Sequence, residues 1–207
     1  YVTGAQPGTD NDTEQWNGTS WTEVGDTNTV GKGSACSGTS TACIKAGGTD
    51  APDRTVNAET WNGSTWTEGA NLNTATTYAG GAGTSTAALS IAGQVPGSPY
   101  VSAKNESWNG TSWTEGNNLN NAGEGGASAG TQTNAAYMGR GAPPATNYFE
   151  GYDGTNWTSL TNLPTNLWYG GGAGAGYTSC LLFGGSTAPG ASQVSQCDYW
   201  NGSSWAE

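Results

Sequence analysis

Short apolar segments alternate with polar turns along the whole chain, and one such segment recurs five times. Each copy carries an acidic residue, an aromatic residue, Asn-Gly or Asp-Gly, and a Trp five positions after the aromatic residue. The copies are residues 14–23, 59–68, 106–115, 150–159 and 198–207. Because Asn-Gly and Asp-Gly favour tight turns with positive φ, each copy predicts two short strands joined by a hairpin.

A second, looser pattern lies between the copies. Gly/Ala-rich stretches near 31–37, 77–83, 124–130 and 169–176 are each followed by a small apolar run that ends in glycine. These apolar runs are residues 42–48, 87–93, 135–141 and 179–185. The two patterns predict two more strands, with glycine where backbones approach closely. Helical periodicity is absent, and four strands in roughly 45–50 residues is typical of one β-propeller blade.

The sequence therefore predicts an all-β fold, a five-bladed β-propeller of four-stranded antiparallel blades in a single domain over 1–207. The expected blades are approximately 1–23, 24–68, 69–115, 116–159 and 160–207. With Tyr1–Gly4 as the first strand, the pattern supplies 19 strands where five full blades need 20, so the first blade should lack one. Three explanations stay open: a slightly open ring, which we favour, an excerpt of a longer array, or a strand from a neighbouring chain.

Two parts of the repeat resemble a known family. Gly184–Gly185 and the run Tyr152–Trp157 resemble the kelch repeat, in which a double glycine ends one strand and a Tyr-Asp-like turn precedes a Trp. The resemblance covers almost the whole chain and implies a kelch-like β-propeller. Four copies depart from it by carrying Trp-Asn-Gly. The unit Trp-Asn-Gly-Thr-Ser-Trp is also similar to repeat arrays in proteins of marine phages and environmental bacteria.

The composition determines what can fill the core of such a fold. Leu, Ile, Val and Phe together number only 19, whereas the chain has ten Trp, nine Tyr and 35 Gly. A shortage of aliphatic residues with a net charge of -11 would by itself favour disorder. Each large ring can bury about 150–250 Å², so we expect a core of aromatic residues, Ala and Gly between thin β-layers.

Several kinds of partner are excluded by the same counts. The five cationic residues are scattered, so no basic patch is available for nucleic acid. No stretch approaches the ~20 apolar residues of a membrane-spanning helix. The chain has no histidine, which excludes His-ligated metals and His-based acyl transfer. It begins at Tyr1 without Met or a signal peptide, so we expect a mature form or an excerpt.

The acidic residues do not indicate an active site. Nine of the sixteen fall in two repeat columns, whereas catalytic carboxylates should be singular. We interpret these columns as hairpin-flanking charges that give solubility and protect strand edges. The columns are Glu14, Glu59, Glu106, Glu150 and Asp198, and Glu23, Glu68, Glu115 and Glu207.

No enzyme and no cofactor are predicted. Asp10–Asp12 and Asp50–Asp53 carry oxygen ligands for calcium but lack a full ligand spacing, so we predict no metal site. Sialidase-type propellers, which the Trp-Asn-Gly turn resembles, need three arginines, and only Arg54 and Arg140 occur. The copper oxidases built on kelch propellers need histidine ligands, and no nucleophile–base pair is evident.

The four cysteines pair naturally along the chain. Cys36 with Cys43, and Cys180 with Cys197, would lie on adjacent predicted strands, where a disulfide can span the gap. Two local disulfides predict an oxidising setting, in a protein that is secreted or displayed on a virion or cell surface. Four buried thiols are the alternative.

Seven Asn-x-Ser/Thr sequons are candidate glycosylation sites. Four of them belong to the Asn-Gly turns, whose chemistry already explains the sequence. Glycosylation itself would need a host with that machinery. The sequons are at Asn11, Asn17, Asn62, Asn105, Asn109, Asn156 and Asn201.

One tryptophan stands outside the repeat. Aligning the Gly/Ala-rich stretches puts Trp168 in a column with Lys32, Thr77 and Glu124. A column that varies while its surroundings repeat is where a symmetric scaffold could hold an asymmetric ligand, so we predict ligand contacts there. Core packing is the alternative for Trp168, and neighbouring Tyr169, which repeats Tyr78, is expected in the core.

We therefore expect a non-enzymatic extracellular recognition module that binds a glycan or a cell surface. The resemblance to phage and bacterial arrays implies a place in a surface appendage, with neighbouring domains in a longer chain. The alternative is a self-associating structural subunit of an extracellular fibre or virion. An open strand edge, low charge density and a surface rich in Thr, Asn and Gly fit that alternative equally well.

Overall fold

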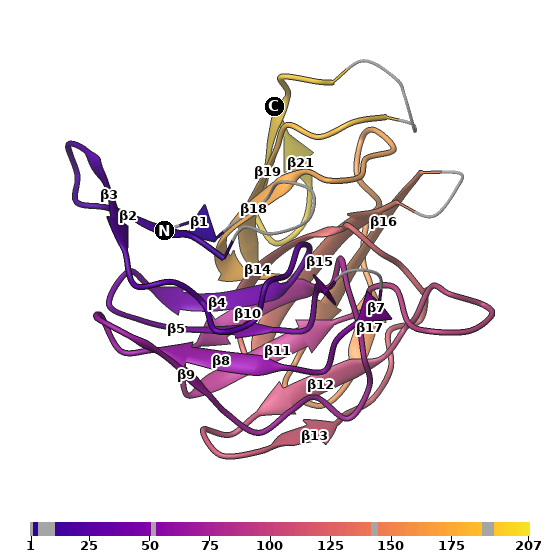
Figure 1. Ribbon diagram of the computed structural model, residues 1–207. Coiled ribbons are helices and arrows are strands. Elements are labelled where there is room, and N and C mark those ends of the chain that lie inside the picture. The colour runs from indigo at the N-terminus through magenta and orange to yellow at the C-terminus, as the bar shows by residue number, and fades with distance from the viewer. Residues whose placement is uncertain (1, 4–10, 51–52, 142–144, 188–192) are drawn as a thin grey trace.

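The structure, a computed structural model, describes residues 2–3, 11–50, 53–141, 145–187 and 193–207. Every regular element in these ranges is a β-strand, and the sheets are arranged as a β-propeller (Figure 1). This confirms the fold class predicted from the repeat. The described ranges hold no helix that could cross a membrane.

Five sheets are the blades of the propeller. Blade 1 contains β1 (Val2–Thr3), β2 (Thr13–Trp16) and β3 (Trp21–Val24). Blade 2 contains β4 (Ala35–Thr39), β5 (Ala42–Ala46), β8 (Ala58–Trp61) and β9 (Trp66–Glu68). Blade 3 contains β10 (Gly80–Thr84), β11 (Ala87–Ile91), β12 (Asn105–Trp108) and β13 (Trp113–Glu115). Blade 4 contains β14 (Ala127–Thr131), β15 (Asn134–Arg140), β16 (Thr146–Tyr152) and β17 (Trp157–Ser159). Blade 5 contains β18 (Gly171–Gly176), β19 (Ser179–Phe183), β20 (Cys197–Trp200) and β21 (Trp205–Ala206). The sixth sheet is the hairpin of β6 (Thr49–Asp50) and β7 (Asp53–Arg54), which follows β5.

Blade 1 lacks one strand, as the sequence predicts. In the other four blades the strands run antiparallel in chain order, beginning with the Gly/Ala-rich strand. In blade 1, β1 pairs with β2 through Val2 opposite Glu14 and Thr3 opposite Thr13. Strand β1 therefore occupies the second position of a blade, and the described part of blade 1 has no Gly/Ala-rich strand.

The Gly/Ala-rich strands β4, β10, β14 and β18 lie innermost, and each contacts the next around a common axis. Their backbones approach closely. A Cβ atom added to Gly81 of β10 would overlap the backbone of Cys36 in β4. This separation explains why glycine and alanine dominate the innermost strands, since larger side chains would push neighbouring blades apart.

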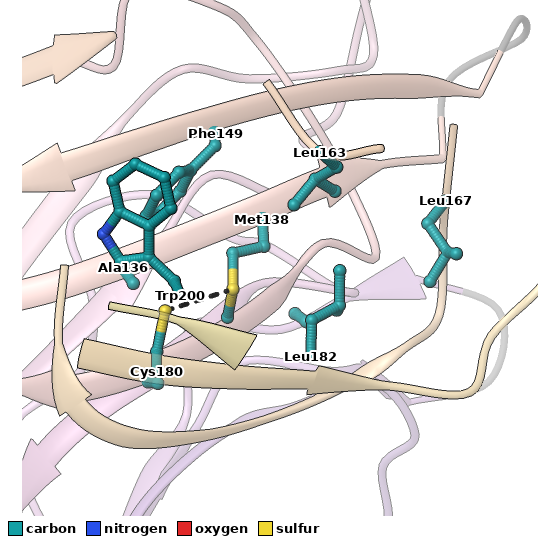
Figure 2. Close-up of a cluster of buried hydrophobic side chains, with 10 residues drawn as sticks. Ala136, Met138, Phe149, Leu163, Leu167, Cys180, Leu182 and Trp200 are labelled. Carbon is teal, nitrogen blue, oxygen red and sulfur yellow. Dashed lines mark hydrogen bonds between the residues drawn. The ribbon is translucent and has the colours of Figure 1, made fainter. Parts of the chain in front are cut away.

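Neighbouring blades are held together by an aromatic pair that packs on the aliphatic face of the preceding blade. Trp108 and Trp113 of blade 3, with ring centroids 5.4 Å apart, share a buried cluster with Ile44 and Ala46 of blade 2. Figure 2 shows the corresponding cluster between blades 4 and 5, which includes Trp200. The core is thus a series of interblade layers, and aromatic rings supply about half of its large side chains.

The Asn-Gly motif builds the turn that joins the outer two strands of a blade. In blade 2 the Oδ1 atom of Asn62 accepts hydrogen bonds from the backbone N–H groups of Ser64 and Thr65, both at 2.9 Å. Gly63 has a φ of 96°, which favours glycine. The asparagine therefore stabilises the turn through its side chain, and the glycine through its backbone.

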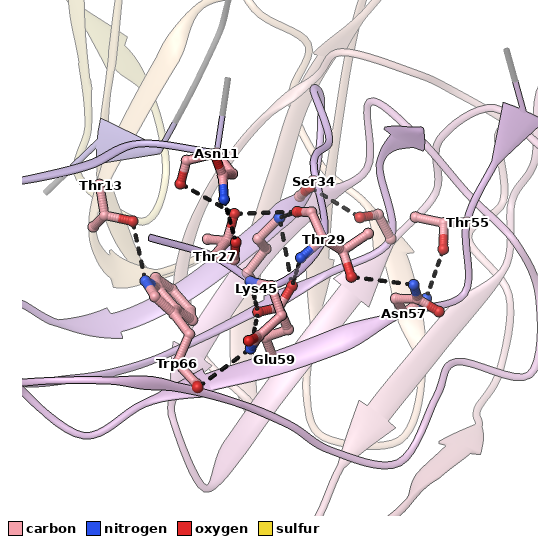
Figure 3. Close-up of polar contacts among 12 residues, drawn as sticks. Asn11, Thr13, Thr27, Thr29, Ser34, Lys45, Thr55, Asn57, Glu59 and Trp66 are labelled. Carbon is pink, nitrogen blue, oxygen red and sulfur yellow. Dashed lines mark hydrogen bonds and ion pairs between the residues drawn. The ribbon is translucent and has the colours of Figure 1, made fainter. Parts of the chain in front are cut away.

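The first acidic column has a role that sequence analysis missed. The carboxylate of Glu106 accepts hydrogen bonds from the backbone N–H of Asn73 at 2.8 Å and of Thr74 at 2.9 Å. The Nδ2 atom of Asn73 donates a third at 2.9 Å. This carboxylate clamp fixes the loop that enters the innermost strand of the same blade. Glu59 forms the same clamp in blade 2 and Glu150 in blade 4 (Figure 3 shows Glu59).

These carboxylates are buried, so their interpretation as charges for solubility and edge protection is wrong. Glu59, Glu106 and Glu150 are at most 4% exposed. A buried carboxylate is stable only where donors surround it, and the N–H groups of the loop provide them. In blades 2 to 4 the glutamate recurs because it fixes the loop that enters each of these blades.

The described residues of the two end blades form no such clamp. In blade 5, Pro164 stands where Asn73 stands in blade 3 and has no N–H to donate. The shorter Asp198 there accepts hydrogen bonds from Gln196 instead, at 2.8 and 2.9 Å. In blade 1, Glu14 is exposed, and no hydrogen bond from a described loop to its carboxylate is seen.

We predict that Glu106→Ala destabilises the fold by about 2–3 kcal/mol, because it removes the acceptor of three hydrogen bonds to a charged group. The measurement is the free energy of unfolding in urea. Glu115→Ala is the matched control in the same blade: Glu115 is exposed and its described ion pair is with the half-buried Lys104 at 3.1 Å. The control should change stability by less than about 1 kcal/mol. Equal effects of the two variants would contradict the clamp.

Candidate functional site

A channel of about 570 Å³ runs between the innermost strands of blades 2 to 5. Its walls are formed by residues 36–40, 81–83, 128–130 and 172–174, which are Gly, Ala, Ser, Thr and one Cys. Ligand sites in proteins commonly have volumes of about 300–1,000 Å³. Within the described residues the channel walls contain no charged or aromatic side chain, so they offer only backbone groups, hydroxyls and small apolar surfaces.

Just before these strands begin, a belt of backbone hydrogen bonds joins the blades. The N–H of Tyr78 donates to the carbonyl of Gly33 at 2.6 Å, that of Gly125 to Tyr78 at 2.8 Å, and that of Tyr169 to Gly125 at 2.7 Å. These four residues occupy the same position in blades 2 to 5. All four have φ between 53° and 70°, in the left-handed region. The belt joins four blades without using any side chain.

Three aromatic rings gather at this belt and form what we call the aromatic platform, Tyr78, Trp168 and Tyr169. The ring centroids of Tyr78 and Tyr169 lie 5.6 Å apart, and those of Trp168 and Tyr169 lie 4.7 Å apart. Glycines make room for the rings: a Cβ atom on Gly125 would overlap Tyr169, and one on Gly141 would overlap Trp168. Tyr169 is 47% exposed, and the other two rings are half-buried.

The structure brings the predicted column of Lys32, Thr77, Glu124 and Trp168 to this same belt. Each residue immediately precedes a belt residue. The hydroxyl of Thr77 donates to the carbonyl of Lys32 at 3.0 Å. Thr77 and Glu124 are buried, whereas Lys32 is exposed and Trp168 half-buried. The column is a real structural position, and ligand contact by these residues stays a prediction.

Tyr169 is the residue that sequence reasoning misplaced. Its equivalence to Tyr78 suggested a core position, but the ring is among the more exposed aromatic groups of the described chain. The sequence feature that indicates the position of Tyr169 is the alternation of Gly33, Tyr78, Gly125 and Tyr169 around the belt. Each glycine leaves the space over which the next ring lies, so large and small residues alternate at the channel end.

A partly buried polar network lies beside the platform, with Glu124 buried and both Arg54 and Gln94 half-buried. Arg54 Nη2 donates to Gln94 Oε1 at 2.7 Å, and Gln94 is in turn hydrogen-bonded to Glu124. Burial raises the pKa of Glu124, which the hydrogen bond from Gln94 and the charge of Arg54 only partly offset. Burial also raises the pKa of Tyr169 to about 12, with further effect from Glu124, so its hydroxyl is neutral at physiological pH. We find no nucleophile beside a base in this described network.

The predicted disulfides are wrong, because no disulfide joins the four cysteines, all of which lie in described strands. In blade 2, Cys36 faces Lys45 and Cys43 faces Gly38, so the two thiols are diagonal neighbours. Diagonal positions are about 7–8 Å apart, too far for a disulfide.

In blade 5 the two thiols lie on opposite faces of the sheet. Cys180 is opposite Trp200 and Cys197 is opposite Phe183, a register offset of three positions along β19. Successive side chains of a strand alternate between its two faces, so an odd offset separates the thiols. The Sγ atom of Cys180 instead contacts Met138 Sδ at 3.6 Å (Figure 2).

The sequons differ in accessibility. Five of them, Asn17, Asn62, Asn109, Asn156 and Asn201, are exposed. Asn11 is half-buried and donates to the carbonyl of Thr27 at 2.8 Å. Asn105 is completely buried, so its prediction as a glycosylation site is wrong for the folded chain.

The calcium candidates fall partly outside the described residues, namely Asp10 and residues 51–52. In the ranges that the structure describes, no three His, Cys, Asp or Glu side chains gather in a group that could hold a metal ion.

We predict that Glu124→Gln raises the unfolding temperature at pH 7 and leaves it unchanged at pH 3. The Glu124 carboxyl group binds its proton more tightly in the folded state than in the unfolded state. The wild type therefore loses stability as pH rises above about 4.5. The neutral amide keeps the shape of the side chain and avoids that loss. Thermal unfolding at both pH values is the measurement, and a lower unfolding temperature for the variant at pH 7 would contradict the prediction.

We predict four alkylated thiols when the urea-unfolded chain is treated with iodoacetamide without reductant. In the folded chain at pH 8, the exposed Cys197 should react readily and the buried Cys180 slowly, because burial raises the pKa of Cys180 to about 12. At that pKa only about one thiol in ten thousand is ionised at pH 8. Peptide mass spectrometry of dilute protein measures both rates; two or fewer alkylated sites in urea would restore the disulfides.

A scan of the chain against protein-family models found no match, and a search of the curated proteins found no relative.

Proposed function

We propose that this propeller is a non-enzymatic recognition module that binds a neutral glycan on its aromatic platform. The observation that carries the proposal is the group of contacting rings of Trp168, Tyr169 and Tyr78, of which Tyr169 is exposed and the other two are half-buried. Flat aromatic faces suit the apolar faces of sugar rings, and a platform of three contacting rings can hold more than one ring position.

The surroundings of the platform support a neutral ligand over a charged one. The Tyr169 hydroxyl stays protonated because its pKa is raised to about 12, so it donates and accepts hydrogen bonds without a charge. Glu124, which precedes the belt residue Gly125, is buried, and the channel walls add small polar groups. Lys32 is the exposed cation of the predicted column, and its ammonium group can donate a hydrogen bond to a sugar hydroxyl or ring oxygen.

The fixed belt favours binding over catalysis. Its four members are joined through backbone hydrogen bonds, so the rings they carry are held in place before a ligand arrives. A preorganised site loses less conformational entropy on binding. An extracellular setting, on a phage or bacterial surface appendage, remains part of the proposal through the resemblance of the repeat alone.

The test is a glycan array followed by calorimetry with the soluble oligosaccharide that binds best. Tyr169→Ala and Trp168→Ala should each weaken binding by about tenfold or more, since each removes one stacking face. Tyr100→Ala is the control: Tyr100 is 44% exposed but makes no ring contact with the platform among the described aromatics.

An array without any binder would overturn the proposed function. Binding that Tyr169→Ala and Trp168→Ala leave intact, while circular dichroism shows both variants folded, would remove the platform as its site. Turnover of the bound glycan would contradict the non-enzymatic assignment.

A further inference from the structure

The two end blades each expose a face that is buried everywhere else in the propeller. Between blades 2 and 3, 3 and 4, and 4 and 5, the aromatic pair of the later blade packs on the aliphatic face of the earlier one. This contact has a direction, because its two sides differ. The aromatic pair of the first blade and the aliphatic face of the last blade are therefore not covered by another described blade.

The aromatic side of blade 1 is the pair Trp16 and Trp21, which we call the tryptophan face. The two rings lie 5.5 Å apart, with the same tilted geometry as Trp61 and Trp66 in blade 2. Trp61 and Trp66 are 3% and 6% exposed, whereas Trp16 and Trp21 are 43% and 50% exposed. The pair is formed as in the interior of the propeller but covered by nothing in the described structure.

The apolar side of blade 5 is equally uncovered. Leu181 is opposite Tyr199, and Phe183 is opposite Cys197, so all four side chains share one face of the sheet. We call it the blade 5 face. Leu181 is 38% exposed, and Phe183 and Tyr199 are each 45% exposed.

The register shows that this is the face on which the next blade would pack. Leu181 and Phe183 occupy the positions that Leu89 and Ile91 hold in blade 3. Leu89 and Ile91 are at most 1% exposed and lie in one cluster with Trp157 of blade 4. The blade 5 face is thus matched in position and chemistry to an aromatic pair of the repeat.

We propose that the tryptophan face of one molecule packs on the blade 5 face of a second copy of this chain. Among the described residues both faces are exposed, and each has the position and chemistry that the other face would pack against, so we assign a second copy as the partner. The contact continues the interblade packing already present three times in each molecule. Because its two sides differ, it is heterologous, and it propagates into rings or filaments instead of stopping at a symmetric dimer.

Charge sets a further expectation for this contact. Each chain carries a net charge of -11, so two copies repel one another at long range. The proposed faces are apolar and gain nothing from ion pairing. Added salt screens the repulsion and should therefore strengthen the association, the opposite of an interface held by salt bridges.

The experiment is sedimentation velocity of the full chain from micromolar to submillimolar concentration. We expect the wild type to form species larger than dimers as concentration and salt rise. A tryptophan-face variant, Trp16→Ser with Trp21→Ser, and a blade 5 variant, Leu181→Ser with Phe183→Ser, should each weaken self-association by about 30-fold or more. Tyr148→Ser, which removes an aromatic ring 37% exposed on blade 4, should have no effect.

Mixing the two variants gives the sharpest result. Each retains the face that the other has lost, so the mixture should form a one-to-one complex that grows no further. Circular dichroism checks that each variant alone is folded; single-site variants Trp21→Ser and Phe183→Ser replace any that is not. A wild type that stays monomeric at every concentration would overturn the proposal. So would assembly that survives in both variants, or a mixture that does not associate.

Discussion

The packing of an aromatic pair on the aliphatic face of the preceding blade is the interaction on which the rest of the structure depends. A chain with so few aliphatic residues cannot build one continuous core, and this contact gives it a series of small ones. The pair Trp108 and Trp113 illustrates the division of labour: the rings supply apolar area, while the Gly/Ala-rich strands allow blades to approach. A repeated sequence can specify such a fold because the same contact forms at each interface between blades.

Each position of the repeat contributes to the interface between blades in a different way. The asparagine of the Asn-Gly turn holds the hairpin that presents both rings, as Asn62 does for Trp61 and Trp66. The glutamate fixes the loop that brings the chain from one blade to the next. In blade 3 the Nδ2 atom of Asn73 in that loop donates both to Glu106 and to the backbone carbonyl of Trp113. The turn, the carboxylate and the rings therefore form one unit in each of blades 2 to 4, and losing any of them loosens the same junction between blades.

Sequence patterns predicted the strands and hairpins because those depend on local preferences that recur. Turn chemistry at Asn-Gly and the spacing of the Gly/Ala-rich stretches were enough to place 19 blade strands and the incomplete first blade. The partners of Glu106 and the separation of Cys180 from Cys197 were not predictable in this way. The partners of Glu106 lie in a loop 33 residues away in sequence. Whether the two cysteines share a face of the sheet depends on the strand register, and a shift of one residue would change the answer. Tyr169 was misplaced because repetition in sequence was equated with burial, whereas the glycine of the intervening blade decides how far the ring is covered.

The backbone belt has a consequence for how such a protein can change. Four blades are joined at the channel end by main-chain groups alone, and glycine and tyrosine already occupy equivalent places in it. Replacement of a side chain there leaves the hydrogen bonds that fix the geometry intact, provided that the new residue tolerates a left-handed backbone. The residue just before each belt position is freer still, as Lys32, Thr77, Glu124 and Trp168 show. Selection could therefore exchange the surface presented by this end of the propeller one residue at a time, while the frame beneath it is inherited unchanged.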